Sequence, residues 1–230
     1  MASQQNYLIW DFDGTLAYRP GQWSGTMLQV LQRFSNLEID LETMRPYMRK
    51  GFPWHNPTCV HPPMRPAGDW WDALLPVFEE AFTGCRVPPD QAKELAGKVR
   101  SVYTDITEWR LFEDTLEVLR DLLDEGWNHV VLSNHVPELP ALIDGLGLSP
   151  LISRIVNSAV TGFEKPHPRA FEAAISALDH PGAVWMIGDN IEADVLGAES
   201  VGLRAILVRN DDPRAVRRAR NLRDVRAFLG

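Results

Sequence analysis

The chain has 230 residues and a mass of 26.0 kDa, which is enough for one sizeable α/β core or for a core with a small inserted domain. With 45% hydrophobic and 23% charged residues it has the composition of an ordinary globular protein, which excludes wholesale disorder, a fibrous repeat and a disulfide mini-scaffold. The 31 acidic and 23 basic residues give a net charge of -8, which disfavours a general nucleic-acid binder because such proteins gain affinity by neutralising phosphates.

Targeting and redox signals are absent from the sequence. The amino-terminal residues show no basic stretch followed by a long apolar run, and no apolar run elsewhere approaches the ~18 residues that a membrane span requires. We therefore expect a cytoplasmic protein without a membrane partner, as a monomer or a homodimer. Cys59 and Cys85 lie far apart and outside any C-x-x-C pattern, so both are expected to be free thiols.

Short apolar runs with the length of buried strands alternate with helical patterns along the chain. The predicted strands are 7–10, 129–132, 183–187 and 205–208. The clearest predicted helices are 114–125, 168–178 and a segment from about 192 to just before 202. Asp114 suits the N-cap of the first of these helices, and Pro168 suits the first turn of the second. The alternation predicts an α/β fold with a Rossmann-like parallel sheet and helices on both faces.

An inserted domain is expected between the first two strands, because over a hundred residues separate them. We place a helical insertion at 17–108, with the core formed by 1–16 and 109–230. Its candidate helices are 27–34, 72–82 and 90–102, whereas 51–68 contains five prolines and cannot be a helix. The seven arginines from Arg209 onward are expected on the solvated side of one or two closing helices.

Polar residues of catalytic types follow three of the predicted strands. Asp11 follows the first strand, Ser133 follows the second, and Asp189 follows the third after Gly188. Because the ligand crevice of an open α/β sheet lies outside the carboxyl ends of its strands, these side chains are expected to converge on one site.

Asp11 and Asp13 lie two residues apart in the segment D-F-D-G-T. They can face one pocket if the chain leaves the strand there, and Gly14 gives the backbone the freedom to do so. One carboxylate can then attack while the other transfers a proton, provided that their surroundings separate the two pKa values. Alternatively, the pair is an ordinary turn and helix cap, because Asp-Gly is a common turn signal.

Asp189 and Asp194 belong to the segment G-D-N-I-E-A-D, a loop that opens a helix. If they join Asp11 and Asp13 in one crevice, a cation must compensate, because like charges ~4 Å apart repel by about 4 kcal/mol at an effective dielectric constant of 20. Mg²⁺ fits an all-oxygen site, since it is usually held by one or two carboxylates and by phosphate oxygens of the substrate. The alternative is that these acids cap the helix.

Lys165 lies in E-K-P-H-P, where prolines stiffen the loop just before a helix. Such a loop can aim the ammonium group, although a surface lysine in a proline-rich turn is the alternative. Ser133 and Asn134 suit the cap of the next helix, and this role is compatible with phosphate binding because a helix N-terminus is an anion site.

Taken together and in this order, these segments resemble the motifs of the haloacid dehalogenase superfamily of hydrolases. The motifs are D-x-D-G-T after a strand, Ser after a strand, Lys-Pro before a helix and G-D-x-x-x-x-D after a strand. The position of the insertion is similar to that of the subgroup whose helical cap follows the first motif directly. The resemblance covers about 7–17 and 109–208.

The resemblance implies a phosphohydrolase that removes phosphate from a small phosphorylated metabolite through an aspartyl-phosphate. Asp11 would be the nucleophile, and Asp13 would protonate the leaving oxygen and then activate the hydrolytic water. Ser133 and Lys165 would bind the phosphate oxygens.

The resemblance also implies a magnesium site. The carboxylates of Asp11 and Asp189 and the backbone carbonyl of Asp13 would hold Mg²⁺, and Asp194 would orient Lys165 or a metal-bound water. The expected substrate-binding residues are Gly14, Thr15, Ser133, Asn134 and Lys165. Ala193 departs from the pattern, because many relatives have Asn directly before the second acid of the fourth motif.

The aspartate at position 13 bears on the reaction type, because relatives that remove halide lack it and ion-pumping ATPases have lysine there. A phosphomutase resembling β-phosphoglucomutase, and a catalytically idle phosphate-binding or partner-binding relative, are the alternatives. Two interpretations also stay open for the tryptophans at 23, 54, 70 and 71: they form the core of the cap, or Trp54, with His55 and Arg65, contacts the leaving group.

Overall fold

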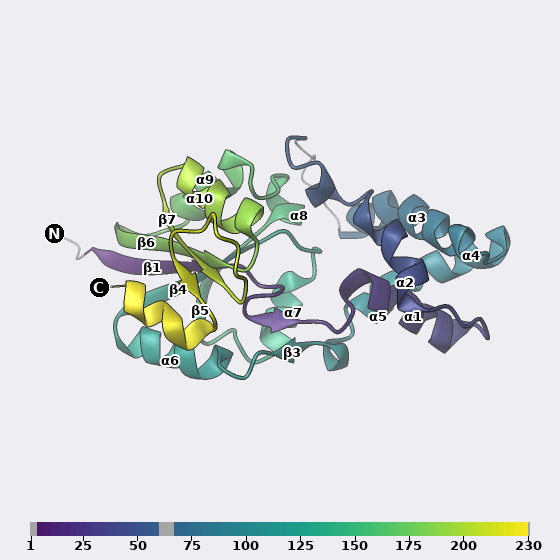
Figure 1. Ribbon diagram of the computed structural model, residues 1–230, viewed down its shortest axis with the longest axis horizontal. Helices are drawn as coiled ribbons and strands as arrows, with labels where there is room; N and C mark the ends of the chain where they lie inside the picture. The colour runs from purple at the N-terminus through teal and green to yellow at the C-terminus, as the bar shows by residue number, and fades with distance from the viewer. Residues whose placement is uncertain (1–3, 60–66, 230) are drawn as a thin grey trace.

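The first apolar run becomes an inner strand of a six-stranded parallel sheet in the computed structural model, which describes residues 4–59 and 67–229 (Figure 1). The strand order is β5-β4-β1-β6-β7-β8. The strands are β1 (Gln5–Trp10), β4 (Trp127–Ser133), β5 (Ile152–Asn157), β6 (Pro181–Gly188), β7 (Arg204–Val208) and β8 (Arg218–Ala219). The α/β prediction is confirmed, and each of the predicted strands forms.

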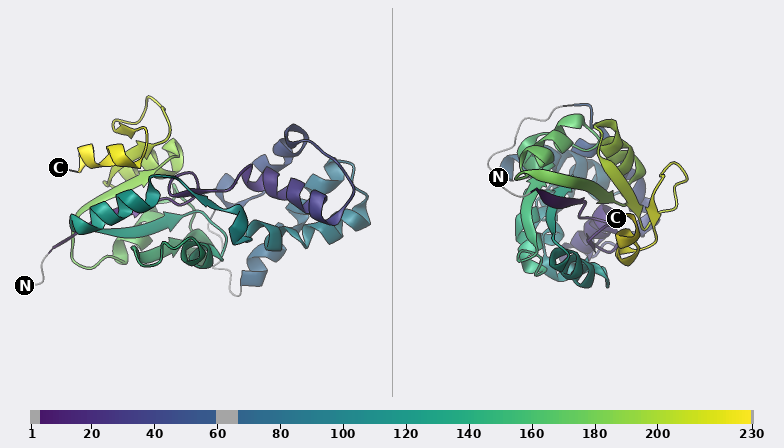
Figure 2. Two further views of the ribbon diagram at one scale, coloured as in Figure 1. Left: turned by 90° about the horizontal axis from the view of Figure 1, so that it is seen from below. Right: turned by 90° about the vertical axis from the view of Figure 1, so that its left-hand side faces the viewer.

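Helices cover both faces of this sheet (Figure 2). They are α6 (Thr115–Asp124), α7 (Leu139–Gly145), α8 (Ser158–Thr161), α9 (Pro168–Ser176) and α10 (Gly197–Ser200), the last preceded by a π-helical segment, Ile191–Leu196. Side chains of β1 alternate between the two layers, as the two-residue period of a strand requires. Leu8 and Trp10 pack in one hydrophobic cluster with α6 and α7, and Tyr7 and Ile9 pack in another with α9 and α10.

The helices of the insertion, within residues 22–59 and 67–103, lie beside the core (Figure 1). They are α1 (Gln22–Phe34), α2 (Leu41–Met44), α3 (Ala67–Gly84), α4 (Pro89–Ala96) and α5 (Val99–Tyr103), with short 3-10 turns at Arg45–Arg49 and Pro53–His55. The expectation of a single helix over 90–102 is wrong, because α4 ends at Ala96 and a new helix begins at Val99. Of the proline-rich segment, Pro62, Pro63, Arg65 and Pro66 lie outside the described residues.

Aromatic side chains form the interior of the insertion. Trp23, Trp70 and Trp71 are buried, and Trp23 stacks on Tyr103 with ring centroids 4.0 Å apart. Trp54 is only partly buried. The interpretation as a cap core therefore holds for Trp23, Trp70 and Trp71, whereas contact of Trp54 with the leaving group stays a prediction. None of the helices within the described residues is long and apolar enough to cross a membrane.

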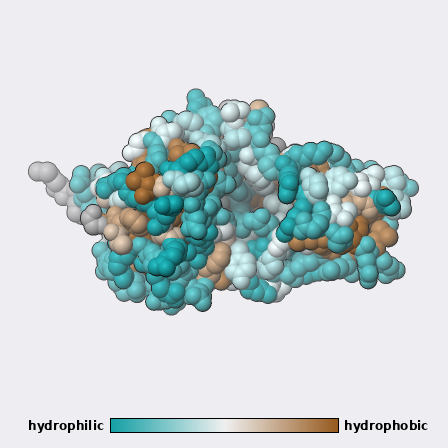
Figure 3. Space-filling view, in the orientation of Figure 1, coloured by the Kyte–Doolittle hydropathy of each residue, from teal (hydrophilic) through white to brown (hydrophobic). Residues whose placement is uncertain are grey.

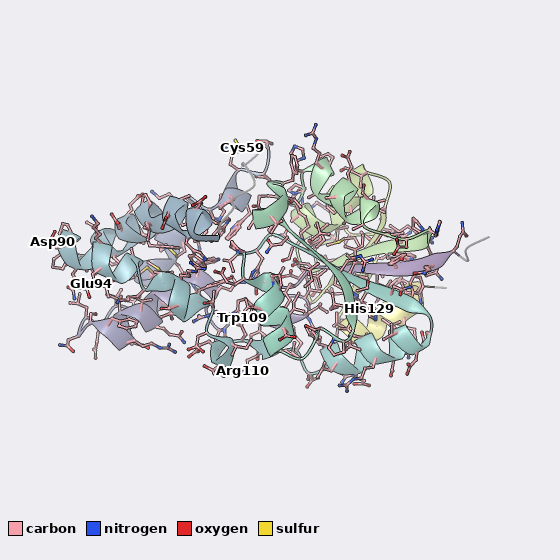
Figure 4. All side chains as sticks on the ribbon, turned by 180° about the vertical axis from the view of Figure 1, so that it is seen from behind. Cys59, Asp90, Glu94, Trp109, Arg110 and His129 are labelled. Atoms are coloured by element: carbon pink, nitrogen blue, oxygen red, sulfur yellow. The ribbon has the colours of Figure 1, made fainter. Side chains whose placement is uncertain are left out.

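Two short antiparallel strands connect the core to the insertion. β2 (Ala17–Tyr18) leads out, and β3 (Arg110–Leu111) returns after the 3-10 turn Ile106–Glu108. Trp109, at the start of the return, is buried and donates from its indole to the carbonyl of Tyr103; Figure 4 labels it with Arg110 at this junction. The junction is therefore packed.

The carboxyl-terminal arginines do not all lie on a solvated helix face, contrary to expectation. The tail forms β8 and a 3-10 helix, Leu222–Phe228. Arg209 turns inward, with its guanidinium 3.8 Å from the ring centroid of Phe112, and donates to the carbonyl of Thr15. It also forms an ion pair with Asp114. Asp114 occupies the N-cap position of α6 but does not cap it, because its carboxylate bonds to Arg209 and to the backbone N–H of Leu222.

Replacing Arg209 with alanine is expected to lower the free energy of unfolding by about 3 kcal/mol, because it leaves the carboxylate of Asp114 buried without its cation. Denaturant unfolding measures this. Arg220→Ala is the matched control: its side chain is 89% exposed, so losing its ion pair with Asp224 should cost less than about 1 kcal/mol. Equal losses in the two variants would contradict the role given to Arg209.

Candidate active site

A cavity of about 510 Å³ lies between the carboxyl ends of the core strands and the helical insertion. In the space-filling view the surface is hollowed between these two bodies (Figure 3). The cavity is lined by these predicted site residues: Asp11, Asp13, Ser133, Asn134, Lys165, Asp189 and Asp194. The structure thus brings together residues from four separate segments of the sequence. Gly14 and Thr15, which we expected to bind substrate, do not line the cavity.

The first loop explains why Gly14 and Thr15 are away from the cavity wall. The backbone of Asp11 continues the sheet by donating to the carbonyl of Ile187, and the chain then turns, with Gly14 donating to the carbonyl of Ala17. Gly14 has a φ of 93°, and a Cβ there would lie 2.4 Å from Oδ2 of Asp189. Glycine is therefore needed for the turn and for the close approach of Asp189.

Lys165 joins two of the carboxylates. Its Nζ lies 2.8 Å from Oδ1 of Asp11 and 2.6 Å from Oδ1 of Asp194, and its side chain is 2% exposed. Burial opposes its charge, but Asp11 and Asp194 outweigh this effect and raise the pKa of Lys165 above its ordinary value. The ammonium group is therefore fixed and charged.

Ser133, the last residue of β4, and Asn134, which follows it, complete this arrangement. The side chain of Asn134 clamps the backbone of Lys165, because its Oδ1 accepts from the N–H at 2.7 Å and its Nδ2 donates to the carbonyl at 2.9 Å. Ser133 donates from its hydroxyl to Oδ1 of Asp11 at 2.9 Å. One oxygen of Asp11 thus accepts hydrogen bonds from both Ser133 and Lys165.

Three acids of the site, Asp13, Asp189 and Asp194, have surroundings that raise their pKa values. Asp13 is partly exposed as a residue, but its carboxyl Oδ1 is buried without a hydrogen-bond partner among the described residues. This burial, together with the charge of Asp11, raises its pKa to about 7. Burial and neighbouring carboxylates also raise the pKa of Asp189 and, despite Lys165, that of Asp194.

The donor set fits a hard divalent cation. Asp11, Asp189 and Asp194 each offer one carboxylate oxygen, and these oxygens lie within 4.8 Å of one another. Asp194 is already engaged, since Oδ1 accepts from Lys165 and Oδ2 accepts from the backbone of Asn190 at 2.9 Å. Asp11 and Asp189 therefore remain as the carboxylates for a metal ion, and oxygen ligands of this kind suit Mg²⁺.

The glycine before Asp189 also has a steric role. A Cβ on Gly188 would lie 2.1 Å from Oδ2 of Asp194. Only glycine lets Asp194 reach back to Lys165 at this depth, so G-D-x-x-x-x-D encodes this contact as well as the two acids.

The insertion supplies the other wall of the cavity, which the sequence only partly indicated. Its lining residues are Gln22, Trp23, Trp54, His55, Pro57 and Tyr103. Trp54 and His55 were among the candidates for contact with the leaving group, whereas no motif marked Gln22, Pro57 or Tyr103. Asn190 and Glu192 also line the cavity and were not anticipated. The one sequence signal for Tyr103 is that it is an aromatic residue close to the segment that returns to the core.

Comparisons with known proteins show the family of the chain. A family model described as haloacid dehalogenase-like hydrolase matches residues 6–202. The phosphoserine phosphatase of Thermus thermophilus is 32% identical over 145 residues, which cover 60% of this chain and 57% of that protein. The ribulose-1,5-bisphosphate 5-phosphatase of Halopiger xanaduensis is 32% identical over 130 residues, covering 56% and 53%. The chain thus spans only a little over half the length of these curated relatives.

A solved structure shares the fold over its full length. The HAD-hydrolase YfnB of Bacillus subtilis, in a crystal structure described as bound to magnesium, superposes with a TM-score of 0.74 at 17% identity, covering 99% of each chain. At this level of identity the likeness concerns the fold alone.

Proposed function

The chain belongs to the haloacid dehalogenase-like hydrolases, and from this premise we propose that it is a Mg²⁺-dependent phosphohydrolase acting on a small phosphorylated metabolite. The observation that carries the proposal is the convergence of Ser133 and Lys165 on one oxygen of Asp11, with the carboxyl of Asp13 beside it. The phosphatases among its relatives support the same reaction class.

Asp11 is the nucleophile in this proposal. Both of its hydrogen bonds fall on Oδ1, so Oδ2 attacks phosphorus, and the bond between phosphorus and the leaving oxygen breaks. Lys165 and Ser133 place positive charge and a hydroxyl donor where the phosphoryl oxygens arrive, and they stabilise the charge spread over them. When bound by Asp11 and Asp189, Mg²⁺ adds a further positive charge beside these oxygens.

Asp13 transfers protons in both halves of the reaction. Its pKa of about 7 lets it hold a proton for the leaving oxygen at neutral pH. Once that proton has left, the carboxylate accepts a proton from water, and the water oxygen attacks phosphorus and releases Asp11. Asp194 keeps Lys165 in place throughout, through the 2.6 Å contact between them.

The helical insertion serves as a cap in this scheme. It forms one wall of the cavity, and the chain passes to and from it through β2 and β3. A wall on a separate body can close over a bound phosphate ester and exclude water from the aspartyl-phosphate.

Hydrolysis of p-nitrophenyl phosphate tests the proposal. We expect activity with Mg²⁺ that is lost with a chelator and is also lost in Asp189→Asn. Mg²⁺ at a hundred times its dissociation constant should stabilise the fold by about 2.7 kcal/mol, or about 5–10 °C in melting temperature for a chain of this size. Asp189→Asn should lose most of this shift.

Glu94→Gln is the control, because Glu94 is exposed on α4 at the far end of the insertion (Figure 4). It should keep both the activity and the thermal shift. Full activity in the presence of chelator would refute the metal dependence, and the absence of phosphate release from every ester tested would refute the phosphohydrolase.

A further inference from the structure

The wall that the insertion presents to the cavity is aromatic and uncharged. Trp23, Trp54 and Tyr103 dominate it, and its remaining members are Gln22, His55 and Pro57. Burial lowers the pKa of His55 below its ordinary value, although a hydrogen bond with the backbone of Lys50 opposes this, so its imidazole is largely neutral at pH 7. The described part of this wall therefore offers no fixed positive charge.

The core side of the cavity is strongly acidic. Its charged lining residues are Asp11, Asp13, Asp189, Glu192, Asp194 and Lys165. Lys165 is the one lysine or arginine among the described lining residues, and it already contacts two carboxylates. Glu192 pairs with Arg214, which is exposed and does not line the cavity.

The charge of Arg19 opposes the rise in the pKa of Asp13, but Arg19 itself does not line the cavity. It is buried against the ring of Tyr103, with its guanidinium carbon 5.9 Å from the ring centroid. Its Nη2 donates to Gln29 and to the carbonyl of Val102. Among the described lining residues, a second anion would therefore face carboxylates and aromatic rings.

The aromatic wall is also rigid and flat. Trp23 stacks on Tyr103 at an interplanar angle of 13°, and Trp54 stacks on Phe52 at the same angle with centroids 4.8 Å apart. Trp54 remains partly exposed toward the cavity. Trp54 is held by Phe52 and Trp70, and its exposed surface at the cavity can stack on another ring with little loss of conformational entropy.

We propose that the leaving group of the natural substrate is an uncharged, ring-bearing alcohol that stacks on Trp54, so that the enzyme selects monoesters without a second anionic group. This inference rests on the proposed phosphohydrolase function. A sugar ring and the ring system of a nucleoside share the required chemistry, and the substrates below distinguish them.

Matched esters test the selection by charge. Glucose 6-phosphate and uridine monophosphate represent the two kinds of neutral ring, and 6-phosphogluconate and phosphoglycolate carry a carboxylate. We expect kcat/KM for at least one neutral ring ester to exceed that of both carboxylates by about 100-fold, because like charges brought together in a binding site are strongly disfavoured. The preferred ring ester then identifies the sugar or the nucleoside.

Equal or faster hydrolysis of 6-phosphogluconate or phosphoglycolate would overturn the inference and leave the phosphohydrolase intact. If p-nitrophenyl phosphate and all of the esters stay unhydrolysed, the proposed function itself fails and the inference falls with it.

Substitution of Trp54 tests the stacking. Trp54→Leu should raise KM for the preferred ring ester about tenfold, the scale of losing one stacked ring, while Trp54→Phe restores most of the affinity. The acyclic ester 2-hydroxyethyl phosphate is the comparison substrate, and its kcat/KM should fall at least about threefold less than that of the ring ester in Trp54→Leu, since it has no ring to stack. Equal losses for the ring ester and the acyclic ester would contradict a specific contact with Trp54.

Discussion

Asp11→Asn is expected to lower kcat for p-nitrophenyl phosphate by about 10⁴-fold or more, the scale on which removal of a catalytic nucleophile acts. Asparagine matches aspartate in size and keeps an oxygen that can accept from Ser133 and Lys165, so the fold and the loop around Lys165 should persist. Its neutral amide cannot attack phosphorus. The assay is made at saturating Mg²⁺, so that weaker metal binding does not account for the loss.

A trapping experiment tests which residue carries the phosphoryl group of the intermediate. An acid quench during turnover, followed by peptide mass spectrometry, should find a phosphoryl group on the peptide that contains Asp11 in the wild type and none in Asp11→Asn. Glu94→Gln should trap as the wild type does, because its side chain is exposed and distant from the cavity. A phosphoryl group on another residue, or an unchanged rate in Asp11→Asn, would refute the mechanism.

The strands that the sequence revealed are those buried on both faces. β1, β6 and β7 end in continuous runs of buried residues, so their local composition marks them. β5 was missed because its first four residues are half or fully exposed and carry Ser153 and Arg154. β8 is two residues long and depends on pairing with β7, which no local pattern reveals.

The core half of the candidate site could be predicted for a topological reason. Parallel strands bring their carboxyl ends to one edge, so Asp11, Ser133 and Asp189 converge wherever the strands pair in parallel. The insertion half could not be predicted, because Tyr103 and Gln22 reach the cavity only through the packing of α1 and α5 on each other and on the linkers.

The role of Arg209 was predicted wrongly for the same reason, because its partners, Phe112 and Asp114, are nearly a hundred residues away in the sequence.

Asp13→Asn is expected to have an effect that depends on the leaving group. With an alkyl phosphate, kcat should fall by about 10² to 10⁴-fold, the range for loss of general acid–base catalysis, because the departing alkoxide no longer receives a proton. p-Nitrophenolate leaves without protonation, so the first step on p-nitrophenyl phosphate should remain fast. Hydrolysis of the aspartyl-phosphate still lacks its base.

The variant should therefore release one equivalent of p-nitrophenolate in a burst and then turn over slowly, whereas the alkyl phosphate should give no burst. Stopped-flow absorbance measures the burst. Mg²⁺ titration is the control, because the proposal gives the side chain of Asp13 no part in holding the metal. A burst on p-nitrophenyl phosphate separates the two proton transfers assigned to Asp13. Protonation of the leaving oxygen is not needed with this substrate, so deprotonation of the hydrolytic water limits the rate. Uniform loss on both substrates without a burst, or loss of Mg²⁺ affinity alone, would show that Asp13 does not carry them.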